Sequence, residues 1–395
     1  MQISNRLGLD LPTGSAGVSF SSSYQLGICC LLGALLIWEL AVIPVSAAPA
    51  RSSRSLSSAE ARLVNSPTDN YIAGMEYADF WQRKRMPLKI FVHPGADVAG
   101  FDSRYVEVFK NACQSWSLAT DNMVSFEFTE DAAKADIDVQ WTANPSTWKS
   151  KPDGHELGAC EPDMVLHEGI DHASIYLLTT SDQNHVGLKA MQFASLHELG
   201  HALGLGHSGR KTDIMARAVE VSKTSLAGET TVDACASEIK LSSRDVTTIK
   251  LVYTAKQKLD DIRLKRLDDR STCFALCNEA ARQISAGDSG QAIIFLREVC
   301  YLDSSYKVAL ENLMAAYFNC GVELYNKQHY SEALPILERA LDLGQKVGTA
   351  SELGQMRSVE RNCLIAGEQK NQTLPSTPIN TQATYSGRAH VRGSR

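Results

Sequence analysis

The chain contains the stretch His197-Glu198-Leu199-Gly200-His201-Ala202-Leu203-Gly204-Leu205-Gly206-His207, and Met215 follows eight residues later. On an α-helix His197 and His201 are one turn apart, so both rings project from one face and can reach one ion. A third ligand from the same straight helix would point away, so the chain must turn before His207. Gly204 stands where a left-handed residue could end the helix. The spacing therefore predicts that the three histidines bind one metal ion.

Three imidazole ligands are typical of a catalytic zinc ion, because the fourth tetrahedral position is left open for water. Glu198 is placed to take a proton from that water, whose pKa zinc lowers to about 7. The same carboxylate can later protonate the departing amine. The motif thus predicts direct hydrolysis without a serine or cysteine nucleophile.

Two other interpretations of the motif stay open. One is an inactive copy that has kept the residues without turnover. The other is an amphipathic core helix that carries histidines by chance, with a buried stripe of Leu196, Leu199, Ala202 and Leu203.

The stretch from His197 to Ser208, with Met215, resembles the metzincin clan of zinc metalloendopeptidases and its matrixin (matrix-metalloprotease-like) branch in particular. A second matrixin-like stretch, residues 241–253, is similar to the closing helix of that family. The resemblance covers about residues 78–255. It implies one catalytic Zn²⁺ and a tight turn that places Met215 beneath the zinc ligands.

The residues before the motif fit the fold that this resemblance implies. Residues 86–92 predict a first strand, and residues 103–119 carry apolar side chains at helical spacing. Three more strands are expected at 124–128, 135–141 and 172–178. We expect an α+β fold, namely an α/β/α metzincin catalytic domain with a mainly parallel twisted sheet and an active-site helix, followed by an all-α helical-repeat domain.

Two features depart from the animal matrixins. No latency segment of the Pro-Arg-Cys-Gly type precedes the first strand, and the faintly similar residues 158–163 lie inside the domain, where we expect a surface loop. In addition, a long segment, residues 217–240, separates the methionine turn from the closing helix. By family analogy this segment borders the substrate-binding side.

Four more histidines lie in the protease region beside several aspartates. One interpretation is a second, structural Zn²⁺ or Ca²⁺ site of the kind that matrixins often carry, and the other is a set of solvated loop side chains. The spacing matches no ligand pattern, which favours solvated side chains, so only one zinc ion is assigned. These residues are His155, His167, His172 and His185, with Asp153, Asp163, Asp171 and Asp182.

The N-terminal residues predict a signal peptide or a signal anchor. Residues 26–45 are hydrophobic, Glu39 interrupts the run, and the small residues of Val45-Ser46-Ala47-Ala48 predict cleavage after Ala47. Because the uncharged core, residues 26–38, is shorter than the about 20 residues that a membrane span needs, we expect a secreted, periplasmic or extracellular protein. An uncleaved membrane anchor is the alternative. Two of the ten cysteines, Cys29 and Cys30, would leave with a cleaved signal peptide. Some of the other eight could pair in an oxidising compartment, such as Cys160 with Cys235.

The C-terminal part is predicted to be helical. Gly321, Leu324, Ala333, Leu337 and Ala340 resemble the spacing of the tetratricopeptide (TPR) repeat. An earlier copy places Ala280, Ala292, Leu296 and Val299 at the same offsets, 41 residues upstream. Stacked repeats form a concave face that suits a peptide or a partner helix, so this part is either a docking module or a support for the protease.

Composition sets the remaining limits. The 395 residues are 44% hydrophobic and 21% charged, with a net charge of −6, which is typical of a folded soluble protein. No basic patch with interleaved aromatic residues is present, so nucleic acid is not an expected partner. A membrane would be a partner only if the N-terminal segment stays uncleaved.

We expect six parts along the chain. They are a signal peptide or signal anchor (1–47), a flexible leader (48–77), the protease domain (78–257), a charged helical linker with a solvated face (258–272), TPR-like repeats (273–345), and a C-terminal helix remnant with a disordered tail (346–395).

The leading hypothesis is a zinc metalloendopeptidase that cleaves protein substrates, with Glu198 as general base and His197, His201 and His207 as ligands. The alternative is a TPR-type interaction scaffold that carries an inactive protease-like domain. An exopeptidase ranks last, because metzincin clefts run open at both ends.

Overall fold

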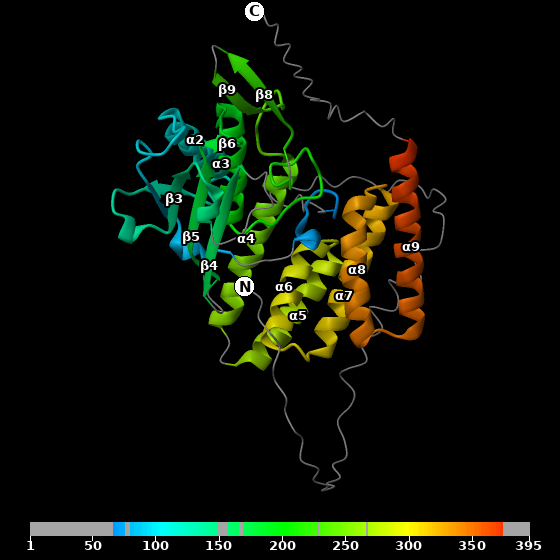
Figure 1. Cartoon of the computed structure of the whole chain (residues 1–395). Coiled ribbons are helices and arrows are strands. Elements are labelled where there is room, and N and C mark those ends of the chain that lie inside the picture. The colour runs from blue at the N-terminus through cyan, green and yellow to red at the C-terminus, as the bar shows by residue number, and fades with distance from the viewer. Residues whose placement is uncertain are drawn as a thin grey trace, which may run out of the picture. The chain divides into compact units, whose positions relative to one another are not determined.

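The helix that carries the histidine motif packs on a five-stranded sheet that is mostly parallel. A computed structural model describes residues 66–75, 80–148, 157–165, 169–217, 219–226, 229–265 and 268–373 (Figure 1). Its first sheet has the order β2-β1-β3-β5-β4, and all neighbours are parallel except the pair β4 and β5. The strands are β1 (Leu88–Val92), β2 (Phe126–Phe128), β3 (Ile137–Thr142), β4 (Gly158–Val165) and β5 (Gly169–Leu178).

Alternation of side chains explains why the central strands form where they do. In β3 the residues Ile137, Val139 and Trp141 are buried, and those between them are more exposed. Ile137 pairs with Ala173 of β5, and both are fully buried. A strand with period-two burial packs one face on a helix layer.

The expectation of a surface loop at residues 158–163 is wrong. These residues form most of β4, which pairs antiparallel with β5 at the edge of the sheet. Gly158 and Pro162 make this stretch read as a loop. However, proline is tolerated on an edge strand, where its missing N–H need not contribute to a ladder.

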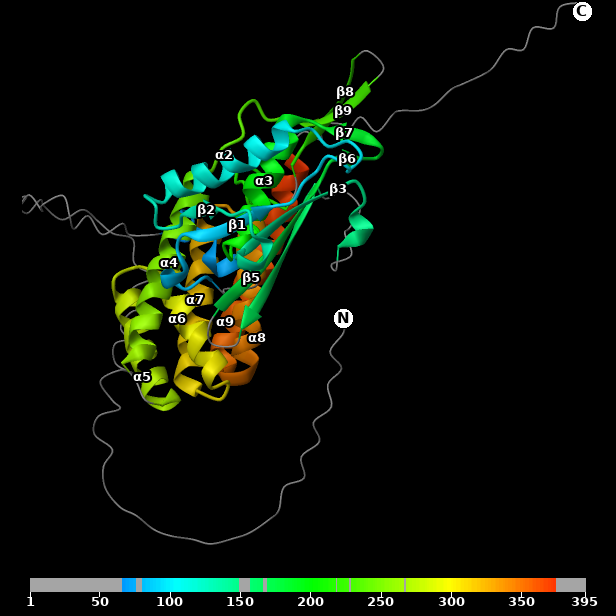
Figure 2. The same ribbon diagram turned by 90° about the vertical axis from the view of Figure 1, so that its left-hand side faces the viewer.

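Two helices cover this sheet beside the site. Helix α3 (Leu188–Ala202) packs against β4 and β5, and α2 (Arg104–Ala119) packs against α3. Figure 2 shows α2 and α3 running side by side. Trp116 of α2 is fully buried and donates from its ring N–H to the carbonyl oxygen of Leu196 at 3.1 Å. The apolar face of α2 therefore fixes the position of the motif helix.

The segment between the methionine turn and the closing helix forms a hairpin. Its strands β8 (Val221–Leu226) and β9 (Glu229–Ala234) are antiparallel, and β9 also pairs with β7 (Asn184–Val186). With β6 (Thr180–Ser181) they make a second sheet of order β6-β7-β9-β8.

The closing helix is longer than the matrixin-like stretch. Helix α4 (Ser243–Leu264) begins with a capping box, in which Ser242 and Asp245 satisfy each other's backbone N–H groups. The sequence predicts that the charges of its C-terminal turns form a solvated face, but some of them instead pair with residues of the following helices. Lys258 binds Glu279 at 2.5 Å, and Arg263 forms an ion pair with Glu298. These charges attach α4 to the helices that follow.

The helices after α4 pack as antiparallel neighbours in chain order. They are α5 (Asp269–Ser285), α6 (Ser289–Leu302), α7 (Lys307–Asn326), α8 (Tyr330–Val347) and α9 (Ala350–Thr373). Small residues sit where two helices approach. A Cβ at Gly321 of α7 would lie only 2.6 Å from the Leu337 side chain of α8. The predicted fold class, α+β followed by all-α, is confirmed.

The residues just before the protease domain are packed. Residues 66–75 belong to the stretch for which a flexible leader is expected, and here Tyr71, Ile72 and Met75 are buried in the common core. The short 3₁₀ helix η2 (Ile72–Gly74) contacts α6 and α8. Three further 3₁₀ turns are η3 (Arg83–Arg85), η4 (Ala132–Lys134) and η5 (Pro145–Thr147).

Several predictions concern residues outside the described ranges. The signal segment 1–47, the leader up to residue 65 and the tail from 374 belong to this group. Within the described ranges, no helix has the length and apolar content needed to cross a membrane. The eight cysteines found there carry free thiols, and Cys273 and Cys277 are buried on α5.

Candidate metal centre and active site

Helix α3 presents two of the three motif histidines. Its C-terminal end is held by Trp81, whose ring N–H donates to the carbonyl oxygen of Ala202 at 2.7 Å. The chain then reverses at Gly204, where φ is 93°. An L side chain is strained at this angle, which explains why glycine stands there. The turn brings His207 back toward His197 and His201.

The three rings converge on one point. One nitrogen from each of His197, His201 and His207 lies within 4.8 Å of the other two. The second ring nitrogen has a backbone partner in both His197 and His201. Nδ1 of His197 lies 2.7 Å from the carbonyl oxygen of Ile214, and Nδ1 of His201 lies 2.7 Å from that of Leu205.

These contacts show that the rings fit a metal ion. A carbonyl oxygen only accepts, so Nδ1 of each ring carries the proton and Nε2 carries a lone pair. The Nε2 atoms of His197 and His201 nevertheless face each other at 3.0 Å. Two facing lone pairs repel unless a cation lies between them. Backbone acceptors that fix the ring tautomer are typical of histidine–zinc sites.

Burial keeps both helix histidines neutral. Burial, together with the neighbouring rings of the triad, lowers the pKa of His197 to about 4 and that of His201 to about 3. A neutral imidazole is the form that binds metal. The site is therefore ready to bind a cation at neutral pH.

These shifts predict acid sensitivity of the metal-free protein. In the unfolded chain both histidines titrate near pH 6.5, so between about pH 6.5 and pH 3–4 the unfolded state binds more protons than the folded state. Their contribution to stability is present above pH 6.5 and is lost as the pH falls toward 4. Thermal unfolding of the chelator-treated protein should show a falling midpoint over this range. The variant His201→Gln should show a shallower dependence, and an equal slope would contradict this origin.

Glu198 is buried next to the first ligand and faces strand β4. A Cβ added to Gly158 would lie 2.7 Å from Cγ of Glu198 and 3.0 Å from its Oε1. Only glycine at the start of β4 leaves room for this carboxylate. Sequence reasoning missed Gly158, because nothing in the sequence links it to the motif.

Cys160, two residues further along β4, also lies near this carboxylate. Burial raises the pKa of its thiol, and the charge of Glu198 raises it further. The thiol therefore stays protonated in the metal-free protein.

Met215 packs under the helix that carries the ligands. It is fully buried, and a Cβ at Gly200, which precedes His201, would lie 2.4 Å from the Met215 sulfur. Gly200 therefore has a packing role that its place within the motif did not reveal. The thioether fills the space directly below the α3 segment that holds both ligands.

Asp245 of the closing helix fixes the methionine turn. Its carboxylate accepts from the backbone N–H groups of Ile214 at 2.9 Å and Met215 at 3.4 Å, and from the Tyr71 hydroxyl at 3.1 Å. The carbonyl oxygen of Ile214 in turn orients the His197 ring. Asp245 therefore supports the first ligand indirectly, through the backbone of Ile214. The capping-box spacing from Ser242 is the sequence signal that marks this residue.

The other histidines do not join the triad. His172 lies on β5, 3.0 Å from Asp138 and 3.8 Å from Asp163, and His185 lies on β7. His155 and His167 lie outside the described residues, as does Asp153. Among the described residues, His197, His201 and His207 form the cluster whose donor atoms could surround one ion.

The C-terminal helices reach the edge of the site. A cavity of about 420 Å³ is lined on one side by His207, Ser208 and Arg210, and on the other by Glu332 and Ile336 of α8. The third ligand therefore lies beside the helical part of the chain.

Comparison with known families agrees with this geometry. The family model of the matrixins, peptidase family M10, matches residues 80–254, a little under half of the chain. No curated protein matches the chain. The match covers the sheet, the motif helix and most of α4, and it ends before the C-terminal helices begin. Together, the matrixin match at residues 80–254 and the cluster of three histidines support a matrixin-like zinc metalloprotease.

Proposed function

We propose that the chain is a zinc-dependent endopeptidase that hydrolyses peptide bonds in protein substrates. The observation that carries the proposal is the convergence of His197, His201 and His207 on one point, beside the buried carboxylate of Glu198. The rings supply three neutral nitrogen ligands. The carboxylate supplies a base adjacent to them in the chain.

The proposed chemistry divides between metal and protein. Bound zinc would polarise the scissile carbonyl and make water acidic enough to lose a proton at neutral pH. Glu198 would take that proton and later deliver it to the departing amine. Met215, Gly200 and Asp245 would keep the ligand rings in place, as their contacts with α3 and the methionine turn support.

We propose that the substrate binds as an extended strand along β4. This strand is at the edge of the five-stranded sheet, so one side of its backbone has no partner strand among the described residues. Its first residue, Gly158, lies against Glu198. A peptide added to this edge would gain main-chain hydrogen bonds and pass the carboxylate. Such a cleft is open at both ends, which favours cleavage within a chain.

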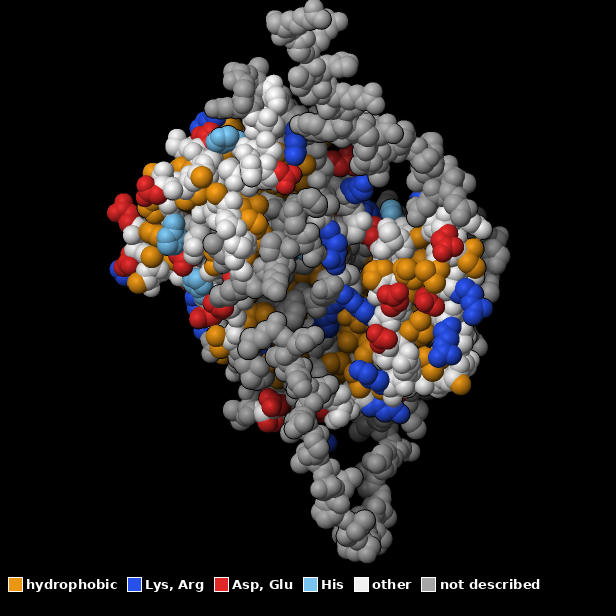
Figure 3. Space-filling view, viewed as in Figure 1, with side chains coloured by type: hydrophobic (Ala, Val, Ile, Leu, Met, Phe, Trp, Pro, Cys, Tyr) orange, Lys and Arg blue, Asp and Glu red, His pale blue; other side chains and the backbone are white. Residues whose placement is uncertain are grey.

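The C-terminal helices would recruit a partner or the substrate, as TPR-like repeats do. Figure 3 shows hydrophobic side chains gathered on the surface over α8 and α9, interspersed with charges. Leu364 and Ile365 of α9 are 41% and 47% exposed. We propose that the chain acts after export, in a secreted, periplasmic or extracellular setting, or as a membrane-anchored form.

Cleavage of a peptide library by the whole chain tests the proposed activity. We expect internal cleavage in the presence of zinc, no cleavage after chelation, and recovery when zinc is added back. The cleavage positions separate an endopeptidase from an exopeptidase. A folded, zinc-loaded chain that cleaves no peptide would support the alternative of an interaction scaffold with an inactive protease domain.

A further inference from the structure

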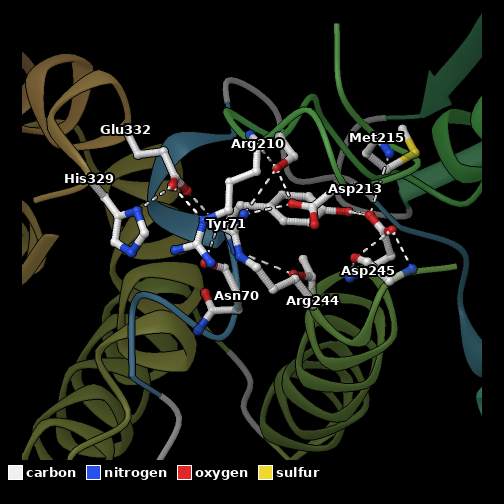
Figure 4. Close-up of polar contacts among 12 residues, drawn as sticks. Asn70, Tyr71, Arg210, Asp213, Met215, Arg244, Asp245, His329 and Glu332 are labelled. Carbon is white, nitrogen blue, oxygen red and sulfur yellow. Dashed lines mark hydrogen bonds and ion pairs between the residues drawn. The ribbon is translucent and has the colours of Figure 1, made fainter. Parts of the chain in front are cut away.

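A buried ion-pair network joins helix α8 to the loop that carries the third ligand. Glu332, in the first turn of α8, is bound by two guanidinium groups (Figure 4). Its Oε1 lies 2.7 Å from Nε of Arg210, and its Oε2 lies 2.6 Å from Nη2 of Arg244. The network therefore links three segments that are far apart in the sequence.

Both guanidinium groups lead to the His207 loop. Arg210 is part of that loop, three residues after the ligand. Arg244 binds Asp213 at 2.6 Å, and Asp213 accepts a hydrogen bond from Ser208, the residue directly after His207. Ser208 also donates its backbone N–H to Met215 at 2.6 Å. The path from Glu332 to the ligand thus consists of direct contacts.

The close approach of α8 requires a glycine in the loop. A Cβ at Gly209 would lie 2.7 Å from Cγ of Glu332. Helix α8 makes a second approach through Arg339, which donates to the carbonyl oxygens of Ala73 and Met75 at 2.7 and 2.8 Å. Met75 in turn packs against Gly206, because a Cβ there would lie 3.2 Å from the Met75 side chain. The helix therefore supports the loop on both sides of His207.

His207 depends on such support more than the other two ligands do. His197 and His201 are fixed by the backbone of α3, whereas His207 lies on a segment without regular secondary structure. A ligand on a loop is only as well placed as the contacts that hold the loop. In this chain those contacts include a residue of the helical part.

We propose that Glu332 is a positioning residue for the metal site, which makes α8 part of the catalytic unit. The proposal rests on the metalloprotease function proposed above. Glu332 acts through Arg210, Arg244 and Asp213 and touches neither metal nor substrate. A residue that merely fastened the helices to the protease would affect unfolding but would leave the affinity and geometry of the folded metal site unchanged.

The test compares Glu332→Gln with Glu338→Gln, a change at an exposed glutamate on the same helix. We expect Glu332→Gln to raise the zinc dissociation constant about tenfold or more, as loss of outer-shell support does. The visible absorption spectrum of the Co²⁺-loaded protein should shift, because it reports ligand geometry. For peptide hydrolysis, kcat should fall while KM changes little, since β4 is untouched. Glu338→Gln should match the wild type in every measurement.

A folded Glu332→Gln variant with the zinc affinity and cobalt spectrum of Glu338→Gln would overturn the proposal. If Glu332→Gln does not fold, Gly209→Ala decides, because its Cβ displaces the same glutamate without removing the charge. It should also weaken zinc binding, and unchanged affinity would overturn the proposal. Metal affinity and the cobalt spectrum need no turnover. A wild-type chain that binds zinc but cleaves nothing would therefore refute the proposed function alone.

Discussion

Replacing Glu198 with glutamine should reduce peptide hydrolysis about 10²–10⁴-fold, the usual contribution of a positioned general base. Glutamine keeps the size of the side chain, so the packing against Gly158 is preserved. Its amide cannot accept a proton at neutral pH. Because Glu198 is not among the clustered ligands, zinc should bind the variant as tightly as the wild type. Single-turnover hydrolysis and zinc titration measure the two quantities independently.

The matched control is Glu238→Gln, which changes an exposed glutamate that pairs with Lys240. It should leave both hydrolysis and zinc binding unchanged. If Glu198→Gln kept the hydrolysis rate of this control, Glu198 would not be the base. If it lost zinc together with activity, the carboxylate would have a role in holding the site.

The parts of the fold that the sequence predicted are those with strong local patterns. Alternating apolar residues marked β3, and helical spacing marked α2 and the motif helix. The positive φ at Gly204 follows the same logic, because the third histidine can return only if the helix stops. Local periodicity and a fixed ligand spacing are properties of short stretches, so a single sequence reveals them.

What the sequence did not reveal depends on distant contacts. Strand β4 contains Gly158 and Pro162, which locally favour a loop, yet pairing with β5 makes it a strand. The strands β8 and β9 of the hairpin consist mostly of polar residues, so a hydrophobic pattern does not mark them.

The outer part of the site was hidden for the same reason. The link from Glu332 to Arg244 spans 88 residues, and each residue alone reads as an ordinary surface charge on a helix. Only the tertiary structure shows that both are buried. The ligands could thus be predicted from sequence, whereas the groups that hold them in place could not.

Replacing Arg244 with methionine should destabilise the protein by about 3–5 kcal/mol, because it removes the cation from a buried network. The side chains of Arg244, Asp213 and Glu332 are only 7%, 1% and 8% exposed. Methionine fills much of the same volume but leaves Asp213 without its cation and Glu332 with Arg210 as its one arginine partner, beside His329 at 3.6 Å. Urea unfolding at neutral pH measures the loss. A matched control on the same helix is Lys250→Met, which breaks an exposed pair with Asp121 and should cost about 1 kcal/mol or less.

Neutralising Asp213 and Glu332 as well tests whether unpaired buried charge causes this loss of stability. The triple variant Arg244→Met/Asp213→Asn/Glu332→Gln should regain part of the stability, because neither neutralised side chain is then a buried charge without a partner. The effects of the three changes should therefore not add. If Arg244→Met cost no more than Lys250→Met, the buried network would contribute little to the stability of the fold. If the loss is large and the triple variant recovers, the protease part and the helical part fold as one unit whose shared charges lie beside the third ligand.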